Sequence, residues 1–229
     1  MATSENIVTV AELRAAEART MRDVPEDVLM DRAAAAVADA ALELAAERGL
    51  PSEGLRVCVV AGPGNNGGDA LLAGALLARR GASVVAVVAA DRAHERGVRL
   101  LEEAAGEGAV SGVAFPLGRE RVLDSQLVID GFSGIGGRAG LPDEAWSLLG
   151  RAVAVGLPIV AVDVPSGLAA DSAALPAPDP GARPDVPPRY VVADVTVTFT
   201  APKRCLVEQP AAAAAGRVIV ADVGIELGA

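Results

Sequence analysis

Gly62-Pro-Gly-Asn-Asn-Gly-Gly-Asp69 separates an apolar, β-branched run, Arg56 to Ala61, from a run with helical periodicity, Ala70 to Arg80. The four glycines of this stretch permit a tight turn and let a ligand approach the main chain. Free N–H groups at the start of the helix would point at that ligand with the positive end of the helix dipole. The stretch therefore predicts a strand-turn-helix unit that binds an anionic or oxygen-rich ligand.

Short runs rich in valine and isoleucine alternate with helical patterns along the rest of the chain. Strands in which apolar and polar residues do not alternate are covered on both faces, as in a parallel sheet with crossover helices. We expect one α/β domain over residues 1–229, with a Rossmann-like, doubly wound, mainly parallel sheet between two helical layers. Its ligand crevice should lie beyond the carboxyl ends of the strands. The predicted strands are Arg56 to Ala61, Ser83 to Ala89, Gly112 to Pro116, Gln126 to Ile129, Pro158 to Val162, Val195 to Thr200 and Arg217 to Ala221.

Two helices should precede the first strand, Val8 to Arg22 and a second from Pro25 to Gly49, and three more should follow the glycine-rich turn. Thr9 and Glu12 form a capping-box pattern at the first of them. A proline-rich stretch, 173–189, is predicted to be a loop. The later predicted helices are Gly68 to Arg80, His94 to Ala105 and Pro142 to Val155.

The composition excludes several classes of protein. A formal net charge of −10 argues against a general nucleic-acid binder, since that affinity rests on clustered lysine and arginine. No apolar stretch reaches the roughly 18 residues of a membrane-spanning helix, and the polar N-terminus lacks a secretory signal pattern. Cys58 and Cys205 form no metal-ligand spacing, and His94 is interpreted as a helix cap. We expect a soluble cytoplasmic protein without membrane or nucleic-acid partners.

Three charged residues lie at the carboxyl ends of predicted strands and should meet at one edge of the sheet. Asp130 precedes a second glycine-rich loop, Asp163 follows a doubly buried strand, and Lys203 follows the strand that begins at Val195. A partly desolvated carboxylate suits a general acid or base, and a lysine there could bind phosphate or pair with Asp163. Each residue alone has an ordinary structural explanation, such as a turn cap. Their convergence on one crevice favours function.

Gly62, Gly64 and Gly67 also match the dinucleotide fingerprint of dehydrogenases, with Asp91 near the end of the second strand. Asp69 weakens that interpretation, because a carboxylate in the first helical turn would repel a pyrophosphate. A dehydrogenase stays open as an alternative.

Three separated motifs resemble the YjeF N-terminal domain family, the NAD(P)H-hydrate epimerases. They are Ala61 to Asp69, Asp163-Val-Pro-Ser-Gly-Leu168, and Thr196 to Lys203 followed by Gly216 to Ile225. The resemblance implies an epimerase that interconverts the R and S forms of NADH and NADPH hydrated at C6 of the nicotinamide ring, and so repairs these cofactors. The loop 134–140 matches the family's phosphate-side loop. Departures from the family pattern include Ala70 and Ile135, and Ile135 removes a hydroxyl group from the phosphate-side loop.

The resemblance also implies roles for individual residues. One potassium ion per subunit would be held by Asn66, Asp130 and Ser166. The catalytic roles are our own hypothesis rather than part of the resemblance: Asp163 takes the hydroxyl proton while the C6–N1 bond opens, and Lys203 stabilises the developing charge or relays the proton. Loss of water through an iminium-like ring is the other route. The substrate-binding set would be Asn65, Asn66, Gly67, Gly68, Asp69, Gly134, Ile135, Gly136, Gly137, Arg138, Ala139, Gly140 and Asp163.

The family further implies an NAD(P)H-hydrate dehydratase as functional partner, and many relatives carry one fused after this domain. Family members commonly form homodimers, so the alanine-rich N-terminal helices could pair with a second subunit or pack on their own sheet. The main alternative function is a catalytically weak or inactive ligand-binding or interaction domain of the same family.

Overall fold

The computed structural model describes residues 7–112, 117–178 and 188–228. Seven strands form one sheet in the order β3-β2-β1-β4-β5-β6-β7, and every neighbouring pair is parallel. This confirms the predicted Rossmann-like fold. The strands are β1 (Arg56–Ala61), β2 (Ser83–Val88), β3 (Val110–Gly112), β4 (Leu127–Gly131), β5 (Ile159–Val162), β6 (Val195–Phe199) and β7 (Arg217–Ala221).

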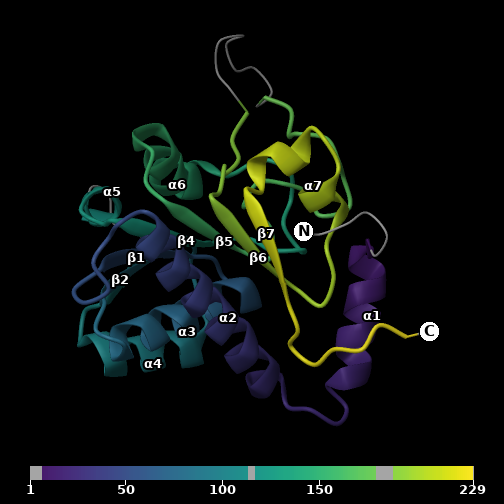
Figure 1. The fold of residues 1–229 in the computed structure, drawn as a ribbon, viewed down its shortest axis with the longest axis horizontal. Helices are drawn as coiled ribbons and strands as arrows, with labels where there is room; N and C mark the ends of the chain where they lie inside the picture. Colours follow the sequence, from purple (N-terminus) through teal and green to yellow (C-terminus); the bar gives the residue numbers. More distant parts are fainter. Residues whose placement is uncertain (1–6, 113–116, 179–187, 229) are drawn as a thin grey trace.

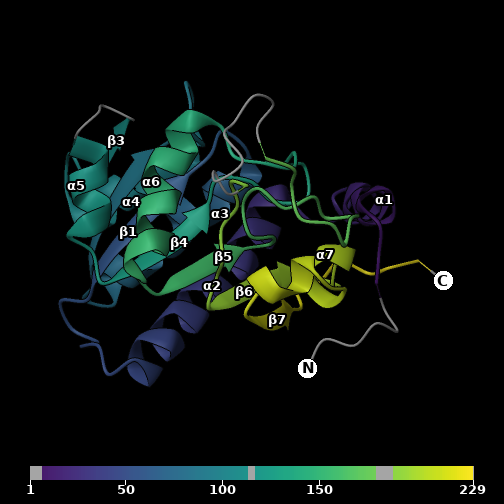
Figure 2. The same ribbon diagram turned by 90° about the horizontal axis from the view of Figure 1, so that it is seen from above.

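Helices cover both faces of the sheet (Figures 1 and 2). Val57 and Val59 of β1 pack toward α2, α3 and α4, whereas Cys58 and Val60 pack toward α5 and α6, so alternate residues of one strand serve two cores. The helices are α1 (Val10–Thr20), α2 (Glu26–Glu47), α3 (Asn65–Arg79), α4 (Glu95–Ala105), α5 (Leu117–Leu123), α6 (Asp143–Val155), α7 (Arg204–Val207) and the 3-10 helix η2 (Ala211–Ala214).

Helix α1 stands apart from these two layers and lies beside the C-terminal segment (Figure 1). The predicted capping box is present: the Glu12 N–H donates to Thr9 Oγ1 at 3.2 Å, and the Thr9 N–H donates to Glu12 Oε2 at 2.8 Å. The Val10 N–H donates to Asp171 Oδ1 at 2.9 Å, and Leu13 packs against Ala201 and Ile135. These contacts fix α1 against the loops at the carboxyl edge of the sheet.

Several element boundaries differ from the prediction. Helix α3 begins at Asn65 rather than Gly68, with Gly64 as an extended N-cap, so Asn65 to Asp69 belong to the first helical turns. Strand β4 continues through Asp130. Strand β3 begins at Val110, and the other predicted residues of that strand, 113–116, lie outside the described residues.

The short helices α5 and α7 were not predicted. The described parts of the proline-rich stretch, 173–178 and 188–189, contain no helix or strand, and 179–187 lie outside the described residues. Within the described parts of the chain, no helix is both long and apolar enough to cross a membrane.

Candidate active site

The glycine-rich turn is held together by close backbone packing. A Cβ on Gly62 would lie 1.9 Å from the Phe132 carbonyl oxygen, and one on Gly67 would lie 2.1 Å from the Gly62 carbonyl oxygen. A Cβ on Gly68 would meet Met30 Cε at 2.6 Å and His94 Cγ at 2.7 Å. None of these glycines has a positive φ, so they are required because neighbouring chain segments come too close for a side chain. His94 itself caps α4 by accepting from the Gly97 N–H at 3.2 Å.

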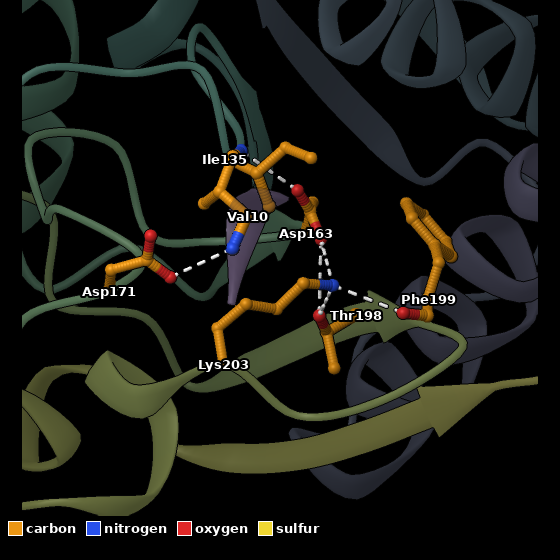
Figure 3. A network of polar contacts seen from close by, with 7 residues as sticks. All are labelled: Val10, Ile135, Asp163, Asp171, Thr198, Phe199 and Lys203. Carbon is orange, nitrogen blue, oxygen red and sulfur yellow. Dashed lines mark hydrogen bonds and ion pairs between the residues drawn. The ribbon is translucent and has the colours of Figure 1, made fainter. Parts of the chain in front are cut away.

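Asp163 directly follows β5, with a left-handed φ of 66° that few non-glycine residues adopt. Its N–H donates to the Val197 carbonyl at 2.7 Å, which holds this strained residue against β6. Both carboxylate oxygens are partnered (Figure 3): Oδ1 accepts from Lys203 Nζ at 2.7 Å and from Thr198 Oγ1 at 3.1 Å, and Oδ2 accepts from the Ile135 N–H at 2.9 Å. The carboxylate is therefore fixed in place by three separate segments.

Lys203 is a buried cation whose donors are all used. Its side chain is 1% exposed, and Nζ also donates to Thr198 Oγ1 at 2.6 Å and to the Phe199 carbonyl at 3.1 Å. A buried ion pair persists when hydrogen bonds satisfy the rest of both groups, as they do here. Lys203 does not line the cavity described below, and it contacts two residues of the lining, Asp163 and Phe199. Lys203 is therefore placed to hold Asp163 from behind the lining rather than to enter the cavity itself.

Asp69, in contrast to Asp163, is a carboxyl group with few stabilising contacts. Its residue is 8% exposed, and Oδ1 is buried without a hydrogen-bond partner. No lysine or arginine pairs with it among the described residues. Burial, followed by the negative charges of Asp163, Glu26 and Glu17, raises the pKa of Asp69 well above its usual value.

Asp130 and Ser166 form a third, fully buried unit. Ser166 donates to Asp130 twice, from Oγ to Oδ1 at 2.6 Å and from its N–H to Oδ2 at 2.8 Å, and the Phe132 N–H donates to Oδ1 at 3.3 Å. The Ser133 N–H donates to Ser166 Oγ at 2.9 Å. Burial raises the pKa of Asp130 to about 6, against the opposing effect of these hydrogen bonds.

Asn66 lies near the same unit. A Cβ on Gly131, the residue after Asp130, would lie 3.1 Å from the Asn66 carbonyl oxygen, and the Asn66 Nδ2 is buried without a partner. A Cβ on Gly134 would lie 2.7 Å from Asn66 Oδ1 and 2.8 Å from Asp163 Oδ2. Carboxylate, amide and hydroxyl oxygens are hard ligands that suit an alkali cation. In the described residues no basic side chain neutralises Asp130, so Asn66, Asp130 and Ser166 could hold such a cation.

These units surround a cavity of about 900 Å³, within the size range of ligand sites. Of the predicted substrate-binding residues, Asn65, Asn66, Asp69, Asp163 and the loop 134–140 line it. Gly67 and Gly68 are buried in the first turns of α3 and do not line it, nor do Asp130, Ser166 and Lys203, which lie behind the lining.

Sequence reasoning missed one wall of the cavity. Leu13, Arg14 and Glu17 of α1 line it, and Phe132 and Phe199 contribute apolar surface. Arg14 Nη2 would lie 3.1 Å from a Cβ on Gly136, so its guanidinium is next to the loop 134–140. Glu17 lines the cavity together with Asp69 and Asp163, and burial followed by the charge of Asp163 raises the pKa of Glu17. The helical periodicity of α1 was visible in the sequence, but nothing there indicated that its polar side meets the sheet edge.

Comparison with known proteins agrees with this architecture. The family described as "YjeF-related protein N-terminus" matches residues 26–205. The chain belongs to this family. An NAD(P)H-hydrate epimerase of Clavibacter michiganensis is 40% identical, over 95% of this chain and 90% of the relative. One from Limosilactobacillus fermentum is 34% identical, over 96% of this chain and 97% of the relative.

Longer members of the YjeF-related family include the bifunctional NAD(P)H-hydrate repair enzyme Nnr of Corynebacterium glutamicum, which is 37% identical over 96% of this chain. The chain spans only 39% of that relative's length. Among solved structures, yeast ynu0 has the same fold, with a TM-score of 0.71 over 87% of this chain and 82% of its own, at 24% identity. Helix α1, with Arg14 and Glu17, lies outside the segment matched by the family.

Proposed function

We propose that this chain is an NAD(P)H-hydrate epimerase, which interconverts the R and S forms of hydrated NADH and NADPH. The observation that carries the proposal is the carboxylate of Asp163, held by buried Lys203 and presented to a cavity of about 900 Å³. Relatives of similar length bear the name NAD(P)H-hydrate epimerase. The carboxylate is the base, and the cavity holds the dinucleotide.

The cavity lining suits both parts of such a substrate. Asp69 and Asp163 line it and can contact the hydrated ring and its hydroxyl group. Arg14 and Arg138 line the cavity with the glycine-rich loop 134–140 and offer guanidinium groups to the phosphates. Arg14 is next to Gly136 of that loop, so the diphosphate is expected between α1 and the loop.

In the ring-opening route, Asp163 takes the proton of the C6 hydroxyl group while the C6–N1 bond breaks. The electron pair of that bond moves onto N1, which gains a proton, and C6 becomes a carbonyl carbon. Rotation about the C5–C6 bond and reclosure on the other face give the other epimer. Lys203 and Thr198 keep the Asp163 carboxylate in position for both transfers. The water-loss route would instead use the same pocket to protect an iminium-like ring from side reactions.

Potassium belongs to this proposal, with Asn66, Asp130 and Ser166 as its ligands. Asp130 is buried, and in the described residues it has only hydroxyl and N–H partners, so a cation would fit an otherwise uncompensated negative charge. When bound, the ion would supply positive charge near the carboxyl groups and the substrate phosphates. A cytoplasmic location and an NAD(P)H-hydrate dehydratase partner are further parts of the proposal. The dehydratase partner is supported by the bifunctional name of the longer relatives.

The test is to incubate the protein with one purified epimer of NADH hydrate and to follow both epimers by chromatography. Exchange well above the spontaneous rate is expected, and Asp163→Asn should reduce it by about 100-fold or more, the scale of general base catalysis. An exchange rate equal to the spontaneous one would favour the alternative of a ligand-binding domain. Hydride transfer with intact NAD would instead support a dehydrogenase.

A further inference from the structure

Asp69 lies at the junction of two cavities. It lines the main cavity, and it also lines a second one of about 110 Å³ between α1, α2 and the C-terminal segment. Glu17 and Asn65 line both cavities as well, whereas Met30 and Ile225 line only the second. Asp69 thus has one face toward the site of the reaction and another toward a separate space large enough for water.

The surroundings of Asp69 favour its neutral form. The groups that face it are Asp163 after β5, Glu26 on α2 and Glu17 on α1, all of them acidic. The nearby ammonium group of Lys203 is occupied by Asp163, and Arg14 lies at the phosphate-side loop. A buried carboxylate with an unpartnered oxygen and no cation is costly, and protonation removes that cost.

The proposed reaction needs a proton donor as well as a base. In the ring-opening route, the electron pair of the C6–N1 bond moves onto N1, which must gain a proton as the hydroxyl group loses one. In the water-loss route, the departing hydroxyl group must gain a proton to leave as water. Lys203 is separated from the cavity by Asp163 and cannot reach the substrate directly. Asp69 is the other deeply buried carboxyl group in the lining.

We propose that Asp69 is the general acid of the reaction and acts from its protonated form opposite the base Asp163. This inference rests on the proposed function. As Asp163 takes the hydroxyl proton and the C6–N1 bond breaks, Asp69 donates its proton to N1. On reclosure, N1 attacks the other face of C6, Asp69 regains the N1 proton, and Asp163 returns its proton to the oxygen. No proton is gained or lost over the cycle, and two carboxyl groups in contrasting environments serve as acid and base.

The experiment compares the pH profile of kcat/KM for the wild type, Asp69→Asn and Asp69→Glu. The wild-type profile should be bell-shaped, because Asp163 must be ionised and Asp69 protonated. Asp69→Asn should lower kcat by about 100-fold or more, with KM within a few-fold, and should lose the alkaline limb. Asp69→Glu keeps a carboxyl group, so it should retain more activity and an alkaline limb. Asp124→Asn, an exposed acid outside the cavity lining, is the matched control.

A second measurement does not depend on turnover. Carbon-13 labelling of the aspartate carboxyl groups, with Asp69 assigned by the difference between wild type and Asp69→Asn, should show Asp69 protonated at pH 7. An active wild type together with an Asp69→Asn variant that keeps its kcat within threefold, or an ionised Asp69 at pH 7, overturns the acid assignment alone. A wild type that does not exceed the spontaneous rate overturns the proposed function.

Discussion

Asp163 and Asp69 line the same cavity but differ in their hydrogen-bond partners and in the charges around them. Asp163 has a lysine, a hydroxyl group and a backbone N–H on its two oxygens. Within the described residues, Asp69 has one buried oxygen without a hydrogen-bond partner, and the charged groups that shift its pKa are all acidic. The difference comes from the elements around them, since β6 and the segment after it bring Thr198 and Lys203 to Asp163. Identical residue types therefore stand in contrasting environments, which is the arrangement expected where one site holds both an acid and a base.

Removing the cation from Asp163 should produce the largest effect. Lys203→Met leaves a buried carboxylate without its partner, and breaking a buried ion pair costs about 3–5 kcal/mol. We expect a loss of that size in the free energy of unfolding, measured with urea, and a strong loss of epimerisation. The double variant Lys203→Met with Asp163→Asn should recover part of the stability. A single variant as stable as the wild type would show that Asp163 does not depend on Lys203.

Gly134→Ala should disturb Asp163 while leaving Asp69 unchanged. The new Cβ would lie 2.8 Å from Asp163 Oδ2 and 2.7 Å from Asn66 Oδ1, and overpacking of this kind costs about 1–3 kcal/mol. We expect kcat/KM to fall by roughly 10- to 100-fold, since 1.4 kcal/mol corresponds to tenfold. Gly136→Ala is the matched control in the same loop, because its Cβ meets only the flexible end of Arg14, at 3.1 Å. Equal losses in both variants would contradict a specific role for the Asp163 contact.

The sequence was sufficient to predict a parallel sheet, because near-continuous valine and isoleucine in β1, β4 and β5 can only be buried by helices on both faces. It also placed Asp130, Asp163 and Lys203 at one edge. It could not show that Lys203 points behind Asp163 rather than into the cavity, because a strand end fixes a residue's position but not its side-chain direction. The role of Gly62 and Gly68 in close packing likewise depends on Phe132, Met30 and His94, which are distant in sequence.

The wall formed by α1 was beyond sequence reasoning for a similar reason. Its apolar face and its capping box predict a helix, but its place depends on tertiary contacts such as Val10 to Asp171. Arg14 and Glu17 consequently enter the site from more than a hundred residues away from the loops that they meet.

The stability contributed by Asp69 should have a distinct pH dependence. Because the pKa of Asp69 is raised in the folded state, the folded protein binds more protons than the unfolded chain above about pH 4, so this residue's contribution decreases as the pH rises toward the folded pKa. Asp69→Asn removes this loss. Its free energy of unfolding should therefore improve relative to wild type between pH 5 and pH 8, by about 1–3 kcal/mol, the cost of an unsatisfied buried group. A constant difference between the two proteins across this range would mean that Asp69 ionises freely.

Asp130 allows a test with the smallest expected effect and the highest selectivity. A bound cation would place a positive charge beside Asp130, as Lys203 does beside Asp163. Its pKa of about 6 means that the folded protein loses stability as the pH rises from about 4 through 6, when Asp130 ionises without a counter-charge. Potassium should offset that loss only where Asp130 is ionised. We expect added KCl, compared with tetramethylammonium chloride at equal ionic strength, to raise the free energy of unfolding by about 1 kcal/mol at pH 8 and by less at pH 5. Asp130→Asn should abolish the difference between the two salts, whereas Asp69→Asn should retain it. The same salt effect in both variants would exclude Asp130 as a potassium ligand.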